Sequence, residues 1–80
     1  MWIKHNHALY NSDYITSIRV ARTTIKARFN DGAEETIGSF KNTEDAENIF
    51  KSVTQALLFE DKNSPGVIIR DTKGRKEDKV

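Results

Sequence analysis

The chain has 80 residues, a formal net charge of +1 and no cysteine. A chain of this length is one small domain with a modest core, and without cysteine it forms neither disulfides nor thiolate metal sites. No apolar run reaches the roughly 18 to 20 residues that span a bilayer, and no signal-peptide core follows Met1–Lys4. We therefore expect a cytoplasmic protein without a membrane partner.

The N-terminal residues predict a short hairpin. Trp2–Lys4 has strand propensity, and Leu9–Tyr10 can pair back against it through a turn near Asn6–His7. Asn11–Asp13 is a loop of turn-forming residues. We expect Trp2 to lie in the core.

Two strands with alternating side chains follow. Tyr14–Val20 is the first, with Ile18 and Val20 facing the core. Thr24–Phe29 is the second, and its apolar residues alternate with two basic residues. Residues 21–23 form the turn between them.

A tight turn and a third strand complete the predicted sheet. Asn30–Gly32 is a hairpin signal, because glycine adopts positive φ without strain. Glu34–Phe40 is the following strand, with Ile37 facing inward.

The clearest predicted element is a helix from Thr43 to about Glu60. Asn42 or Thr43 can cap it, and acidic residues in its first turn suit the helix dipole. Apolar residues recur at three- and four-residue spacing, which predicts one buried stripe. These residues are Ala46, Ile49, Phe50, Val53, Ala56 and Leu57.

The C-terminal residues 63–80 are predicted to lie outside the domain formed by residues 1–62. A breaker run, 63–66, is followed by Val67–Ile69, and residues 67–70 read as a short edge strand or as an apolar piece of tail. From Asp71 onward the chain is charged, with no apolar residue until Val80, so we expect a disordered tail.

These elements predict an α+β fold: an antiparallel meander of three to four strands, covered on one face by the helix to give two layers. The other sheet face is left to solvent, to the tail or to a partner. It is expected to carry Ile15, Ser17, Arg19, Ala21, Lys26 and Arg28.

A further pattern is made up of the segments Met1–Lys4, Asn11–Ile18, Asp31–Gly32, Ile37, Phe40 and Thr43–Ala46. Together these segments resemble small proteins of Gram-positive bacteria and their prophages or mobile elements, in which a few strands precede one helix. The resemblance covers about residues 1 to 60. It implies the fold and a host group, and it carries over no active-site residue.

Residues for catalysis or metal binding are sparse. His5 and His7 are two apart and would share a face if both lay on one strand, but a turn is predicted there, and zinc requires three or four ligands. The serines lack a nucleophile elbow, and the helix dipole accounts for the acidic residues of the helix. We expect neither enzymatic activity nor a cofactor or small-molecule substrate.

Two surfaces remain as candidates for a macromolecular partner. Basic residues can form a phosphate-binding face with the tail, namely Arg19, Arg22, Lys26, Arg28, Arg70, Lys73, Arg75 and Lys76. Apolar residues can instead bind another protein or a second copy in a homodimer, namely Ile15, Leu58, Phe59, Val67, Ile68 and Ile69. Leu58 and Phe59 have the alternative of widening the core face of the helix.

Of these two, we favour a non-enzymatic protein-interaction or adaptor module. Weak nucleic-acid binding by the basic face and tail is the alternative.

Overall fold

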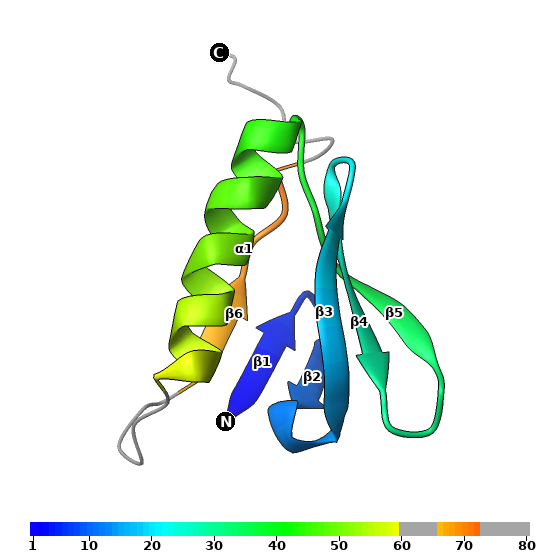
Figure 1. Ribbon diagram of the computed structural model, residues 1–80. Helices are drawn as coiled ribbons and strands as arrows, with labels where there is room; N and C mark the ends of the chain where they lie inside the picture. The colour runs from blue at the N-terminus through cyan, green and yellow to red at the C-terminus, as the bar shows by residue number, and fades with distance from the viewer. Residues whose placement is uncertain (60–65, 73–80) are drawn as a thin grey trace.

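The computed structural model describes residues 1–59 and 66–72, which form one helix and six strands in two three-stranded sheets (Figure 1). The first sheet has the strand order β2-β1-β6 and the second the order β3-β4-β5. The elements are β1 (Trp2–His5), β2 (Ala8–Asn11), a 3-10 turn η1 (Ser12–Tyr14), β3 (Ile15–Ala21), β4 (Thr24–Phe29), β5 (Glu34–Ser39), α1 (Thr43–Leu58) and β6 (Val67–Ile69).

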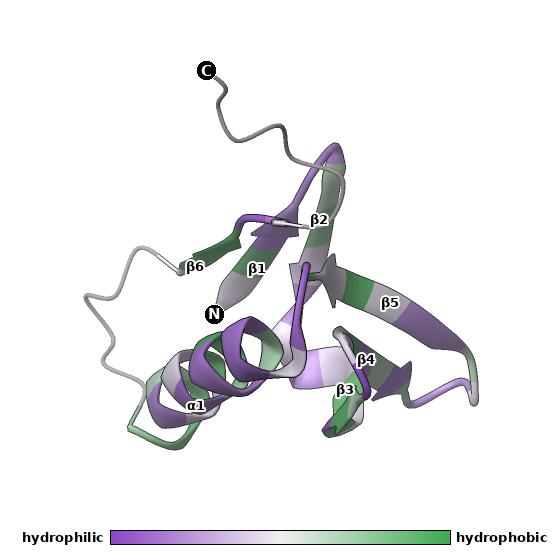
Figure 2. Cartoon of the chain, turned by 90° about the horizontal axis from the view of Figure 1, so that it is seen from above, coloured by the Kyte–Doolittle hydropathy of each residue, from purple (hydrophilic) through white to green (hydrophobic). Residues whose placement is uncertain are grey.

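The predicted α+β class and the antiparallel meander are confirmed, with β3, β4 and β5 as the meander. The two N-terminal strands do not extend this meander but belong to the other sheet. Viewed from above, α1 lies alongside both sheets (Figure 2). No helix in the described part of the chain is both long and apolar enough to span a membrane.

The predicted N-terminal hairpin is present. β1 and β2 are antiparallel, with His5 opposite Ala8 and a two-residue turn in which Asn6 has a φ of 56°. Asparagine tolerates this left-handed conformation better than most residues. The expected burial of Trp2 is wrong: Ile3 and His5 face the core, so alternation turns Trp2 outward, where it is 50% exposed.

The strand β6 pairs parallel with β1, with Ile3 opposite Val67 and His5 opposite Ile69. Ile69 is only 3% exposed and belongs to the core. The residue after Arg70, expected to begin a disordered tail, is held in place: Asp71 accepts a hydrogen bond from the Ser39 N–H at 2.8 Å. Residues 73–80, the rest of the predicted tail, lie outside the described residues.

An irregularity in β3 changes which side chains face the core. Ile15 is opposite Phe29 and Ser17 is opposite Arg28, so Thr16 is an extra residue in the ladder. The extra residue resets the alternation, and Ile15 packs against the core on the same side as Ile18. The expectation that Ile15 shares the solvated face with Ser17 is therefore wrong.

The strand β5 contains a second irregularity. Ile25 pairs with Gly38 and Lys26 pairs with Thr36, which leaves Ile37 as the extra residue. Ile37 and Gly38 are consequently both buried. A Cβ atom at Gly38 would lie 2.8 Å from the Phe40 ring, so the strand passes the core closely at this point.

The helix begins as its sequence predicts and ends slightly earlier. Asn42 is the N-cap, and its side chain accepts a hydrogen bond from the Asp45 N–H at 2.7 Å. The last helical residue is Leu58 rather than one near Glu60. The core combines residues from both sheets, from the helix and from the segment between β5 and α1. These residues are Ile3, Ile25, Ala27, Ile37, Phe40, Ala46, Val53 and Ile69.

Aromatic and polar contacts also join the two sheets. The ring of Tyr10 in β2 stacks on Phe29 in β4 with centroids 5.5 Å apart, and its hydroxyl donates to Glu35 in β5 at 3.2 Å. Burial and the adjacent Glu35 carboxylate raise the pKa of Tyr10 above its ordinary value. Both partners of Tyr10 belong to the second sheet, so this side chain fixes β2 against it.

Candidate functional site

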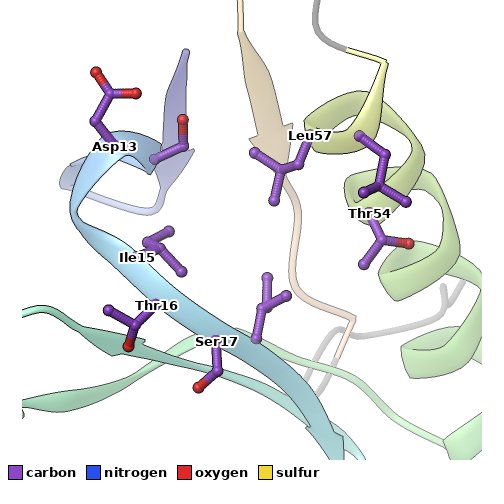
Figure 3. Close-up of a pocket in the computed structure, with 9 residues that line it drawn as sticks. Asp13, Ile15, Thr16, Ser17, Thr54 and Leu57 are labelled. Atoms are coloured by element: carbon purple, nitrogen blue, oxygen red, sulfur yellow. The ribbon is translucent and has the colours of Figure 1, made fainter.

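An open groove lies between the first half of β3 and the last turns of α1 (Figure 3). Its volume is about 360 Å³. Ile15 and Leu57 extend into it from the strand and the helix, whereas Thr16 and Ser17 point away from the helix (Figure 3). Ile18 and Leu58 complete its apolar lining.

Local structure explains why these side chains meet. The extra residue in β3 turns Ile15 toward the helix instead of toward the outer sheet face. On the helix, Leu57 and Leu58 follow Thr54 by three and four residues, and each therefore neighbours Thr54 on the helix surface. The groove thus depends on one strand irregularity and one helical spacing.

The strand that forms one side of the groove is a sheet edge. β3 pairs only with β4, and no strand among residues 1–59 and 66–72 pairs with its other side. Hydrogen-bonded and non-bonded pairs alternate in an antiparallel ladder. Because Ala21 and Thr24 flank the two-residue turn, Ile18 and Val20 belong to non-bonded pairs. Their N–H and C=O groups consequently point to the open edge.

Two exposed apolar side chains lie at the end of the helix, and one of them, Leu58, also lines the groove. Leu58 is 76% exposed and Phe59 is 79% exposed. The alternative that they widen the core face is wrong. Each residue turns the helix by about 100°, so Leu58 lies to one side of the half-buried Leu57, and neither Leu58 nor Phe59 packs against the core.

The other residues of the predicted apolar surface lie elsewhere. Val67 is half-buried against the core and Ile69 is inside it, so Ile69 is unavailable to a partner. Ile68 is 62% exposed, but on the outer face of the first sheet. There it lies opposite Lys4, as does Leu9 from the other neighbouring strand.

The basic residues are distributed over several places. The register puts Arg19 opposite Lys26, and Arg28 follows on the same outer face of the second sheet. Arg19 is paired with Glu34 at 2.9 Å, and the Lys26 ammonium donates to Thr36 at 3.0 Å.

The remaining basic candidates do not extend that face. Arg22 is exposed in the β3–β4 turn, where its φ is 58°. Arg70 is exposed directly after β6 in the first sheet. Lys73, Arg75 and Lys76 lie outside the described residues.

The two histidines do not share a face. His5 is buried at the end of β1, whereas His7 is exposed in the turn. No group of three or more potential metal ligands occurs in residues 1–59 and 66–72. His5 instead lies 2.8 Å from a carboxylate oxygen of Asp71.

Asp71 and Thr72 connect the chain after β6 to three other elements. The Asp71 carboxylate contacts His5 in β1 and accepts from the Ser39 N–H in β5, both at 2.8 Å. Thr72 donates its hydroxyl to Asp45 in the first turn of α1 at 3.3 Å. Burial raises the pKa of Asp71, but the hydrogen bonds from Ser39, His5 and Asn6 outweigh it, and this pKa lies below its ordinary value of 3.8.

Of the groove residues, the sequence pointed to Ile15 and Leu58 but missed Asp13 and Thr54, and assigned Ile18 and Leu57 only to the core. The alternation of β3 and the stripe of α1 do mark these last two as inward-facing. The hydrophobic pattern does not indicate that the helix stops covering β3 near Ile15. Because the helix stops there, Ile18 and Leu57 are partly accessible from the groove.

Comparison of the chain with protein-family models, with curated proteins and with solved structures found no match.

Proposed function

We propose that this protein is a non-enzymatic protein-interaction or adaptor module whose docking surface is the groove between β3 and α1. The observation that carries the proposal is the apolar lining of the groove, which includes the largely exposed side chain of Leu58 at the end of the helix. Contiguous exposed apolar surface on a small domain is typical of a binding site. The partner is another protein or a second copy of this chain, in the cytoplasm.

The test replaces Leu58 by aspartate and uses Leu9→Asp as the matched control. Both leucines are largely exposed, at 76% and 61%, but only Leu58 lines the groove. Random peptides of about ten residues, displayed on phage, are selected against the full chain, and the solution mass is measured by light scattering at several concentrations. We expect peptide binding or self-association that Leu58→Asp lowers at least tenfold, or about 1.4 kcal/mol, and Leu9→Asp does not.

The proposal fails if no peptide is selected and the chain stays monomeric at every concentration. It also fails if the two variants weaken binding equally, because the effect would then not be specific to the groove. Circular dichroism before each measurement verifies that both variants are folded.

Nucleic-acid binding is a second candidate, favoured by the register that gathers Arg19, Lys26 and Arg28 on one outer sheet face. The face also carries Glu34, which pairs with Arg19 and reduces its positive charge. If phosphates bind there, the logarithm of the affinity for single-stranded DNA or RNA falls linearly with the logarithm of salt concentration. Replacing Lys26 and Arg28 by glutamine should then lower that slope by about 0.7 for each phosphate that is no longer neutralised. Binding that is absent at low salt would eliminate this candidate.

A further inference from the structure

We propose that the groove takes an extended peptide strand, which adds to the second sheet along the open edge of β3. The inference rests on the proposed protein-interaction function and specifies the kind of partner. It would turn the order β3-β4-β5 into a four-stranded sheet with the ligand next to β3.

The backbone of β3 provides the first argument. The N–H and C=O groups of Ile18 and Val20 point to the open edge, at the spacing of a strand ladder. A second strand satisfies such groups in register, whereas a helix has already used its own backbone groups internally. Hydrogen bonds from β3 therefore favour an extended ligand over a helical one.

The lining of the groove provides the second argument. The side chains of Ile15, Ile18 and Leu57 lie on the helix side of the edge. Successive side chains of an added strand alternate between the two faces of the sheet. The ligand should accordingly carry apolar residues two positions apart, which enter the groove, with polar residues between them beside Arg19 on the outer face.

Charge provides the third argument. Among the residues 1–59 and 66–72 that line the groove, Asp13 is the one with a charged side chain, and it lies at the rim beside the start of β3. No described residue forms a salt bridge with it. A lysine or arginine at the corresponding end of the peptide would complement it. The C-terminal residues 73–80 of this chain contain a single apolar residue, Val80, and do not supply the alternating pattern.

The peptides selected against the full chain test this inference directly. We expect apolar residues at positions i and i+2 and a basic residue at one end. A synthetic selected peptide, titrated into the labelled protein, should protect the amides of Ile18 and Val20 from hydrogen exchange and leave those of Arg19 and Ala21 little changed. N-methylation at alternate peptide amides should lower affinity about tenfold where the amide faces β3 and little where it faces away.

The Asp13→Asn variant tests the charge argument, with Asp31→Asn in the β4–β5 turn as the matched control. Asp13→Asn should weaken a peptide with a basic end several-fold at low salt and less at high salt, because the pair is exposed and screened. An affinity unchanged by Asp13→Asn, or changed equally by both variants, overturns the predicted basic end.

The outcomes separate this inference from the proposed function. Selected peptides with apolar residues at helical spacing, i and i+3 or i+4, overturn strand addition and support the interaction function. A concentration-dependent dimer that Leu58→Asp abolishes, with no peptide selected, also overturns peptide strand addition and supports the interaction function. The occupant of the groove is then a second copy of this chain. Absence of both peptide binding and self-association overturns both.

Discussion

The carboxylate of Asp71 interacts with strands of two different sheets, with His5 of β1 and with the Ser39 N–H of β5, both at 2.8 Å. Replacement by asparagine retains the shape but removes the charge from these hydrogen bonds. We expect Asp71→Asn to lower the free energy of unfolding by about 1–2 kcal/mol, measured by urea denaturation. Glu47→Gln on the exposed face of α1 is the matched control and should change it by less than about 0.5 kcal/mol.

The same residue predicts a pH dependence. The pKa of Asp71 is lower in the folded protein than its ordinary value of 3.8. A carboxyl group whose pKa is lower in the folded than in the unfolded protein stabilises the fold fully at pH values above the pKa of the unfolded state. This contribution is lost as the pH falls through the pKa of the folded state. The stability difference between the natural chain and Asp71→Asn should therefore shrink as the pH falls below 3.8. A difference that stays the same down to acid unfolding would contradict the role assigned to this carboxylate.

Individual residues were harder to place from the sequence than the segments that contain them. Strict alternation puts residues two apart on one side of a strand, which assigns Ile15 to the same face as Ser17. The extra residue at Thr16 breaks that rule, and no feature of the neighbouring sequence predicts this irregularity. The burial of His5 was equally hard to foresee, since its carboxylate partner lies far along the chain at Asp71.

At the scale of elements, local signals were sufficient where the element is long or closed by a tight turn. The stripe of α1, the Asn42 cap and the Asn30–Gly32 turn all predicted what the structure contains. For the short strand β6, the sequence admits both an edge strand and a piece of tail. Its three residues have no periodicity to read, and its position is decided by the distant partner β1.

The contribution of β6 can be measured by shortening the chain. A version that ends at Asp61 lacks Ile69, which is 3% exposed, and the hydrogen bonds of Asp71. Loss of one large buried aliphatic side chain alone costs about 2–5 kcal/mol, which is a large part of the stability of a domain this small. We expect the shortened chain to lose cooperative thermal unfolding, measured by circular dichroism.

A version that ends at Thr72 is the control, since it retains β6 together with the hydrogen bonds of Asp71 and Thr72. It should unfold cooperatively. If the chain that ends at Asp61 unfolds just as sharply and at the same temperature, then β6 contributes little to the core.

For the whole molecule, the sequence predicted the class of fold but not the division of its strands. Six short strands can form one sheet or two, and the choice depends on pairings between distant segments rather than on local propensity. The groove follows from that choice. Because β1 and β2 pair with β6 rather than with β3, no strand within residues 1–59 and 66–72 covers the edge of β3 beside α1.

The parallel pairing of Ile3 with Val67 has a consequence for how the protein is made. During synthesis β1 emerges long before β6, so its Ile3 side chain lacks one neighbouring strand until residues 67–69 have left the ribosome. Closing so long a loop carries an entropic cost that only the completed contacts offset. The first sheet is completed last, and a nascent chain stalled before Val67 would present β1 to chaperones and to other chains.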